Sequence, residues 1–156
     1  MTTARDIMTK DVITLTPETD ILQAARVLLD NGINGAPVID ESGRVTGLLC
    51  QSDLVIQQKR LPIPSVFALL DMAIPLKSSR QIEKQVNKMA ALKVSEAMTE
   101  NPVTVNPDTD IETIAALMVD NNFHTLPVVE NYRLVGVIGK EDVLRTLLPK
   151  PGENTQ

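Results

Sequence analysis

The amino-acid sequence predicts an α+β fold made of two pseudo-symmetric β-α-β-β-α units with a helical insert between them. Three observations lead to this prediction: short apolar runs bounded by turn residues, apolar residues at helical spacing, and an internal repeat. The repeat is the most specific of the three because it holds its register over most of each unit. We expect the two copies to bury a common apolar face against each other, with function where they meet.

The repeat keeps a constant offset of 90 positions through most of its length, which falls to 89 after a one-residue deletion in the turn at 41–44. The matching segments are Met8-Thr9 with Met98-Thr99, 14–21 with 104–111, Asp30-Asn31 with Asp120-Asn121, Pro37-Val38-Ile39 with Pro127-Val128-Val129, Gly47 with Gly136, and Asp53 with Asp142.

Composition excludes several classes of protein. The chain has 156 residues, of which 43% are apolar, so it is long enough for a core and is not of the disordered type. No apolar run approaches the ~18 residues of a transmembrane helix, no secretory signal is visible, and the single cysteine fits a reducing compartment, so we expect a cytoplasmic protein. A net charge of -5 and a 2% aromatic content argue against nucleic acid as a partner.

The first unit, assigned to residues 1–55, is expected to hold three helices and three strands. Apolar residues recur at helical spacing from Ile21 to Leu29, Asp20 can cap that helix, and Asn31-Gly32 can end it in the left-handed conformation. The expected helices are Ala4–Met8, Ile21–Asp30 and one starting at Ser52-Asp53, and the expected strands are Val12–Leu15, Ala36–Ile39 and Val45–Leu49.

The second unit, assigned to residues 94–148, is expected to repeat this order, and a frayed tail to cover residues 149–156. The expected strands are Val103–Val105, Leu126–Glu130 and Leu134–Ile138, and the expected helices are Asp110–Asn121 and Lys140–Leu148.

The insert, residues 56–93, has no counterpart elsewhere in the chain. From Val66 to Ile74 only Asp71 is polar, so a helix there needs cover, which predicts a homodimer. Seven Lys and Arg against two acidic residues give the insert a charge of +5, whereas the remainder, with eight against eighteen, carries -10. Three interpretations stay open: the insert packs on its acidic host or on a second subunit, docks an effector protein, or touches an anionic membrane surface.

The ordered set of marks in each unit resembles a cystathionine-β-synthase (CBS) domain, and two in tandem resemble a Bateman module. The marks are a Met-Thr pair, a strand end of the type Thr-Val-x-Pro, a helix capped by Asp-Ile, a Leu-Pro-Val-Val strand, and a hairpin glycine followed by Asp. The resemblance covers Ala4 to about Val55 and Val94 to about Leu147. It implies two repeats joined through their sheets, with two equivalent clefts in which AMP, ADP, ATP or S-adenosylmethionine often binds, and a regulatory role in place of catalysis.

The family pattern implies which residues form each cleft. One cleft would combine Thr104, Asn106, His124, Thr125, Leu126 and Pro127 with Ser52 and Asp53. The other would combine Thr14, Thr16, Asn34, Gly35, Ala36 and Pro37 with Lys140 and Asp142. A carboxylate can accept both ribose hydroxyls, and apolar side chains such as Phe123 and Leu126 can enclose adenine.

Departures from the family pattern limit which adenosyl ligands the clefts can bind. Cys50 and Gly139 stand where nucleotide-binding members usually have Ser or Thr, and His124 is the one candidate for the usual basic pair before Leu-Pro-Val. An acidic domain with so few cations would neutralise a triphosphate poorly. This argues for AMP, for a less anionic adenosyl ligand, or for an empty cleft.

Each candidate also has a structural interpretation. Asp53 and Asp142 can cap helices, Ser52 can be an N-cap, and His124 can be a hydrogen-bonded structural residue. Cys50 fits a small buried side chain, and a nucleophilic role would need His124 beside it. A lone His gives no metal site. The sequence therefore predicts a non-enzymatic module that senses an adenosyl ligand and passes its occupancy to a partner, the alternative being a ligand-free scaffold for dimerisation or effector docking.

Overall fold

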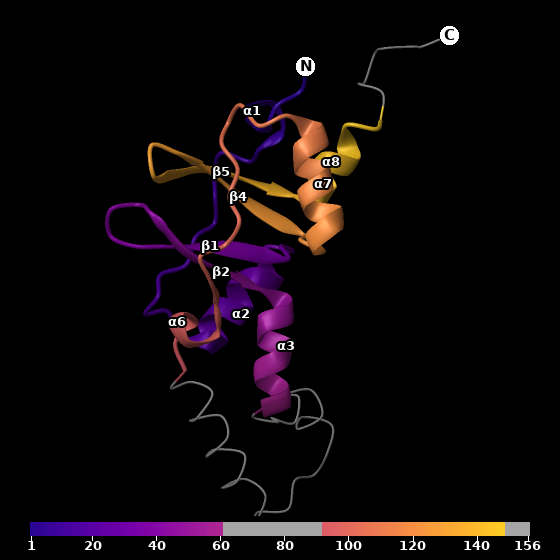
Figure 1. Ribbon diagram of the computed structural model, residues 1–156. Helices are drawn as coiled ribbons and strands as arrows, with labels where there is room; N and C mark the ends of the chain where they lie inside the picture. Colours follow the sequence, from indigo (N-terminus) through magenta and orange to yellow (C-terminus); the bar gives the residue numbers. More distant parts are fainter. Residues whose placement is uncertain (61–91, 149–156) are drawn as a thin grey trace, which may run out of the picture.

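A computed structural model describes residues 1–60 and 92–148 and shows the predicted α+β arrangement of two hairpins flanked by helices (Figure 1). The elements are α1 (Ala4–Ile7), α2 (Ile21–Asp30), β1 (Gly35–Ile39), β2 (Val45–Cys50), α3 (Gln51–Arg60), α6 (Val94–Ala97), β3 (Thr99–Glu100), α7 (Ile111–Asn121), β4 (Thr125–Glu130), β5 (Arg133–Gly139) and α8 (Lys140–Arg145). The predicted apolar segment Val66–Ile74 and nearly all of the basic insert lie outside the described residues.

The two long helices match the predicted ranges to within one residue, because α7 begins at Ile111 and not at Asp110. Helix α2 has the predicted bounds and exits through Gly32 at φ +61°, while α7 exits through Asn122 at φ 56°. Asp110 caps α7 by accepting a hydrogen bond from the Thr113 N–H at 2.7 Å. Two helix ends were misplaced, since α1 ends at Ile7 and α8 ends at Arg145.

The predicted opening strands, Val12–Leu15 and Val103–Val105, are wrong. Each is reduced to one parallel bridge, Leu15 with Val38 and Val105 with Val128. To extend the pairing back towards Ile13 or Val103, the facing strand would have to donate from Pro37 or Pro127, and proline has no N–H.

Helices α1 and α6 are exchanged between the repeats. Although α1 precedes the first repeat, Ala4 is buried in the apolar core of the second, with Ile114, Leu126 and Ile138. Val94 of α6 is likewise buried in the core of the first repeat. Figure 1 shows α1 beside β5 and α7, and α6 beside the first repeat. Each core is therefore completed by the segment that opens the other repeat.

Backbone hydrogen bonds fix this exchange at equivalent positions. The Ala4 N–H donates to the Thr109 carbonyl at 2.8 Å, and the Val94 N–H donates to the Thr19 carbonyl at 2.8 Å. The short strand β3, which the sequence did not predict, pairs with β2, and Thr9 forms the corresponding bridge with Val137 of β5.

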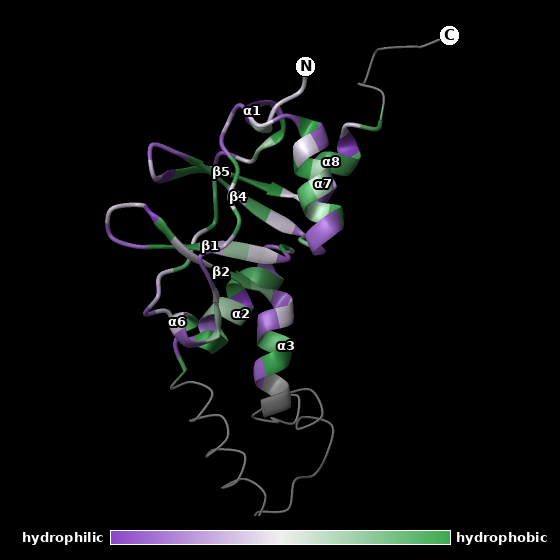
Figure 2. Cartoon of the chain, in the orientation of Figure 1, coloured by the Kyte–Doolittle hydropathy of each residue, from purple (hydrophilic) through white to green (hydrophobic). Residues whose placement is uncertain are grey.

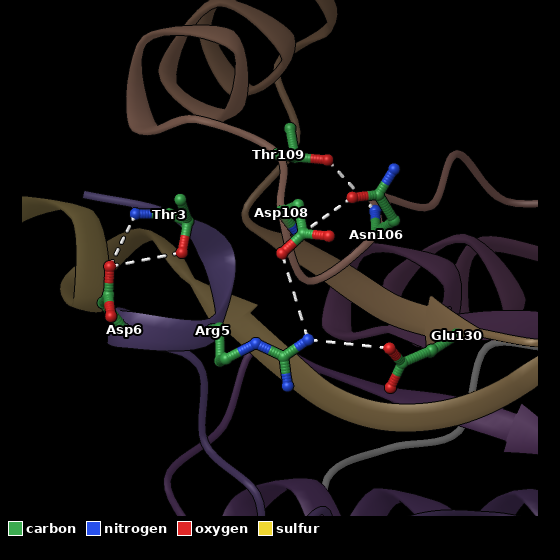
Figure 3. A network of polar contacts seen from close by, with 7 residues as sticks. All are labelled: Thr3, Arg5, Asp6, Asn106, Asp108, Thr109 and Glu130. Atoms are coloured by element: carbon green, nitrogen blue, oxygen red, sulfur yellow. Dashed lines mark hydrogen bonds and ion pairs between the residues drawn. The ribbon is translucent and has the colours of Figure 1, made fainter. Parts of the chain in front are cut away.

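Charged side chains reinforce both docked helices. Figure 3 shows Arg5 of α1 extending to two acidic residues of the second repeat, with Nη2 3.5 Å from Glu130 and 3.9 Å from Asp108. On the other side, Lys93 Nζ lies 2.7 Å from Asp20 Oδ1. Because these ion pairs are exposed, they help to orient the helices but contribute little to the free energy of unfolding.

Apolar residues gather on the strands and the inner faces of the helices, and polar residues on the hairpin turns, as the green and purple regions of Figure 2 show. The two hairpins meet through β1 and β4. A Cβ at Gly35 would lie 3.3 Å from Thr125 Oγ1, so glycine permits this close approach. Gly35 and Thr125 are equivalent residues, which places the pseudo-two-fold axis between them.

In residues 1–60 and 92–148 no helix is long and apolar enough to cross a bilayer. The cytoplasmic location, the exclusion of nucleic acid and the bounds of the predicted domains stay predictions.

The packing of Met8 on Gly136 explains why the repeat pairs a Met-Thr motif with a hairpin glycine. A Cβ at Gly136 would lie 2.5 Å from Met8 Sδ and 2.9 Å from its Cγ. A Cβ at Gly47 would overlap Met98 in the same way. Each methionine belongs to the segment that opens one repeat, and each glycine to the hairpin of the other. The Met-Thr motif and the hairpin glycine therefore indicate that each opening segment packs on the hairpin of the other repeat.

We predict that Gly136→Ala lowers the free energy of unfolding by about 1–3 kcal/mol, the usual range for overpacking. Met8→Ala in the same chain should restore part of this loss because it removes the overlapping atoms. Chemical denaturation of the parent, both single variants and the double variant measures the coupling. Strictly additive losses would contradict the proposed contact.

Candidate functional site

Two cavities lie between the repeats, each named here after its acidic residue. The Asp53 cavity, of about 540 Å³, is formed by the start of α3 in the first repeat and by the segments around Thr99 and His124. The Asp142 cavity, of about 270 Å³, is formed by the start of α8 in the second repeat and by the segments around Thr9 and Asn34. Both are close to the volume range of small-molecule sites, which begins near ~300 Å³.

The two cavities share a wall. Asn34, His124 and Thr125 line both of them. Asn34 and His124 are equivalent residues of the two repeats and lie just before β1 and β4, the strands that meet at the pseudo-two-fold axis. Both cavities therefore lie next to this axis, and a change in their common wall affects each of them.

The structure brings together ten of the sixteen predicted site residues at cavity walls. Ser52, Asp53, His124, Thr125 and Leu126 line the Asp53 cavity. Asn34, Gly35, Pro37, Lys140 and Asp142 line the Asp142 cavity. Their ligand-binding roles stay predictions, but the predicted combination of segments from both repeats is present.

The other six, Thr14, Thr16, Ala36, Thr104, Asn106 and Pro127, line neither cavity. Ala36 and Pro127 are buried in the strands. Thr16 turns towards Thr19, with 2.8 Å between the hydroxyl oxygens, and the Asn106 side chain accepts a hydrogen bond from the Asp108 N–H at 2.9 Å. The polar side chains of Thr16 and Asn106 therefore shape the turns before α2 and α7.

The segments that follow α1 and α6 also line the cavities, through residues that the sequence did not predict. Thr9, Asp11 and Ile13 line the Asp142 cavity, and their counterparts Thr99, Asn101 and Val103 line the Asp53 cavity. The chain bends within both segments, with Asn101 at φ 49°, so no strand periodicity in the sequence signalled these residues. The predicted residues Thr14, Thr16, Thr104 and Asn106 lie later in the same segments, and their ligand-binding role stays a prediction.

Asp53 and Asp142 both cap their own helices. Asp53 Oδ2 accepts a hydrogen bond from the Cys50 N–H at 2.8 Å, and Asp142 Oδ2 accepts one from the Gly139 N–H at 2.7 Å. The structural interpretation of these residues is thus confirmed. It does not exclude ribose binding, because each carboxylate has a second oxygen and each residue lines a cavity.

Burial of Asp53 raises the pKa of its carboxyl, although the hydrogen bond from Cys50 acts in the opposite direction. In the described part of the chain no cation forms an ion pair with it. A partly desolvated carboxylate without a cationic partner costs free energy in the ligand-free fold. Such groups are concentrated at functional sites.

The structure also bears on the other interpretations, namely Ser52 as an N-cap, Cys50 as a nucleophile and a metal site. Helix α3 begins at Gln51, so Ser52 lies inside its first turn and the N-cap interpretation is wrong. Cys50 and His124 both line the Asp53 cavity, but burial, helped by the charge of Asp53, raises the pKa of the Cys50 thiol to about 11. A thiol that is protonated at neutral pH is a poor nucleophile. Among residues 1–60 and 92–148 no group of three His, Cys, Asp or Glu could hold a metal ion.

Two repeats that exchange their opening segments and enclose paired cavities define a tandem CBS-domain protein. Comparison with known proteins agrees, because the CBS domain family model matches residues 4–59 and 94–149. The chain belongs to the CBS domain family.

Three similar proteins illustrate the family. An uncharacterized protein of Methanocaldococcus jannaschii, MJ1426, is 30% identical over 92% of this chain and 90% of its own length. The crystal structure of CBSX2, a protein of Arabidopsis thaliana, in complex with AMP is 25% identical, with a TM-score of 0.69 over 93% of this chain and 95% of that one. The CBS domain pair of protein MJ0100 in complex with 5′-methylthioadenosine and S-adenosyl-L-methionine is 26% identical, with a TM-score of 0.67 over 94% and 95%.

We predict that Asp53→Asn leaves the ligand-free protein at least as stable as the parent at pH 7. The raised pKa of Asp53 means that its ionised form is disfavoured by folding, so stability falls as pH rises through its titration, and an amide oxygen can still accept the capping bond. The matched control is Asp110→Asn, where hydrogen bonds from Thr113 lower the pKa and the charge stabilises the fold above that titration. Thermal melts should therefore show a lower Tm for Asp110→Asn only; a lower Tm for Asp53→Asn would mean that its carboxylate is purely structural.

Proposed function

We propose that this chain is a regulatory, non-catalytic module that binds an adenosyl ligand in the cavities between its CBS repeats and passes occupancy to a partner. One observation carries the proposal. In each cavity an Asp at the start of a helix of one repeat faces two parts of the other repeat. These are the segment that follows α1 or α6 and the first residues of β1 or β4. A ligand there contacts both repeats at once.

The chemistry of the Asp53 cavity suits a nucleoside. Leu48, Val103, Phe123 and Leu126 supply apolar walls for adenine. The Asp53 oxygen that does not cap α3 can accept hydrogen bonds from ribose hydroxyls, which would replace the water that this carboxylate has lost. Apolar walls beside polar side chains that can orient a ligand are typical of a small-ligand site.

Similar proteins support the class of ligand. The CBSX2 structure contains AMP, and the MJ0100 domain pair contains 5′-methylthioadenosine and S-adenosyl-L-methionine. ADP and ATP are less suitable here because few cations line either cavity. We therefore expect AMP or an uncharged or sulfonium nucleoside.

Transmission follows from the exchanged segments. Thr9 and Thr99 line the two cavities and also pair with β5 and β2 of the opposite repeats. A ligand that prefers one spacing of these segments therefore shifts the relative position of the repeats, by no more than its difference in affinity for the two states. We propose that the partner is a second copy or an effector that contacts the 56–93 segment.

The test is a thermal melt with AMP, ADP, ATP, adenosine, 5′-methylthioadenosine and S-adenosylmethionine, on the parent and on Asp53→Asn. A ligand at 100 times its Kd adds about 2.7 kcal/mol to the free energy of unfolding, which raises Tm by several degrees. We expect a rise for at least one of them, and its reduction in Asp53→Asn if the Asp53 cavity is occupied. No rise with any compound would favour the ligand-free scaffold, to which Cys50 and Gly139 point.

Exposed apolar side chains support the proposed homodimer. Leu29 of α2 is 70% exposed and its counterpart Val119 of α7 is 79% exposed, while Val55 and Leu144, also counterparts, are exposed on α3 and α8. A surface with internal two-fold symmetry is suited to an isologous dimer, in which the same patch meets itself.

We predict a dimer at micromolar concentration by light scattering and at least a tenfold weaker dimer for Leu29→Lys/Val119→Lys. A buried ammonium without a partner is strongly unfavourable in such an interface. The control, Gln23→Lys, adds charge at another exposed position of α2 and should leave the dimer intact. A monomeric parent would contradict the prediction.

A further inference from the structure

The two cavities differ in charge at equivalent positions. Gln51, Ser52 and Ile56 follow β2, whereas Lys140, Glu141 and Arg145 occupy the same places after β5. The acidic residues Asp53 and Asp142 are common to both. The repeat therefore offers an internal comparison in which the ribose-binding candidate is constant and its neighbours change.

The Asp142 cavity contains cations that a phosphate can use. Lys140 lines it and forms no ion pair within residues 1–60 and 92–148. Arg145 also lines it, with Nη1 3.5 Å from Asp142 and Nη2 3.8 Å from Glu141. The Arg145 side chain is 70% exposed, and exposed pairs of this kind are worth little, so a phosphate can draw the guanidinium away and free Asp142 for ribose.

The acidic residues of the Asp142 cavity do not prevent Lys140 and Arg145 from binding a phosphate. Asp11 and Glu141 also line it, so the formal charge of both cavities is similar. What differs is the supply of donors, because a phosphate needs a cation close to it to replace its lost hydration. The distribution of charge, and not its sum, separates the two sites.

The Asp53 cavity contains no Lys or Arg among the described residues that line it. At the position of Lys140 it has Gln51, whose amide donates to the Ile33 carbonyl at 2.9 Å. Among the described lining residues Asp53 is the one carboxylate, and His124, which lines both cavities, does not distinguish them. A phosphate here would be desolvated beside a carboxylate, whereas an uncharged substituent would meet Val103 and Phe123 in a cavity of about twice the volume.

We propose that the two cavities divide adenosyl ligands by charge: the Asp142 cavity takes a nucleoside 5′-monophosphate, and the Asp53 cavity takes an uncharged nucleoside with an apolar 5′ substituent, such as a 5′-thioether. This inference rests on the proposed function, because it assigns ligands to the same two cavities. It makes the chain a sensor of two compounds at once.

The experiment is calorimetric titration of the full chain with AMP and with 5′-methylthioadenosine, each alone and each after saturation with the other. We expect one tight site per chain for each compound and no competition between them. Lys140→Gln should weaken AMP at least fivefold and leave the 5′-methylthioadenosine affinity within twofold. Arg26→Gln removes a positive charge from an exposed position of α2 outside both cavities, and should change neither affinity by more than twofold.

The reciprocal variant, Gln51→Lys, gives the Asp53 cavity the cation that it lacks. AMP should then bind at two sites per chain and compete with 5′-methylthioadenosine for one of them. Competition between the two compounds for a single site in the parent, or an unchanged AMP affinity in Lys140→Gln, would overturn the division while leaving the sensor intact. Binding of neither compound would overturn the proposed function and this inference together.

Discussion

The structure depends on the exchange of the two opening helices between the repeats. Ala4 and Val94 are fully buried, each in a core made by the other repeat. The methionines that follow α1 and α6 lie on Gly136 and Gly47, where a Cβ would overlap their side chains. Because each core lacks one wall without the partner segment, the repeats must fold together, and the order of the chain in space differs from its order in sequence.

The same exchange creates the cavities. After α1 and α6, the chain bridges to the opposite hairpin at Thr9 and Thr99, and the residues that follow line the cavities between the repeats. The starts of α3 and α8 close the other side. Asp53 and Asp142 hold these helix starts through their capping bonds. The structural and the proposed ligand-binding role of each Asp are therefore compatible, because they use different oxygens.

The two repeats are alike where they meet at the pseudo-two-fold axis, and they differ in charge farther from it. Gly35 and Thr125 bring β1 and β4 together near the common wall formed with Asn34 and His124, which links the cavities. Away from the axis, the residues after β2 and β5 have lost their similarity in charge. The repeat thus places two cavities at equivalent positions, and the residues that differ between the copies give these cavities different surroundings.

The sequence by itself determined the two-repeat fold, the bounds of α2, the N-cap of α7 and most of the residues on the helix sides of the cavities. These features follow from local patterns: helical periodicity, Asp before a helix, and the register of the repeat. It did not determine that α1 and α6 change places, that the segments after them become cavity walls, or that the expected strands before Leu15 and Val105 are reduced to single bridges. The exchange depends on contacts between residues far apart in the sequence, such as Ala4 with Thr109, Val94 with Thr19 and Met8 with Gly136. A repeat looks the same in sequence whether its opening segment packs on its own copy or on the other, so only the tertiary structure could decide between them.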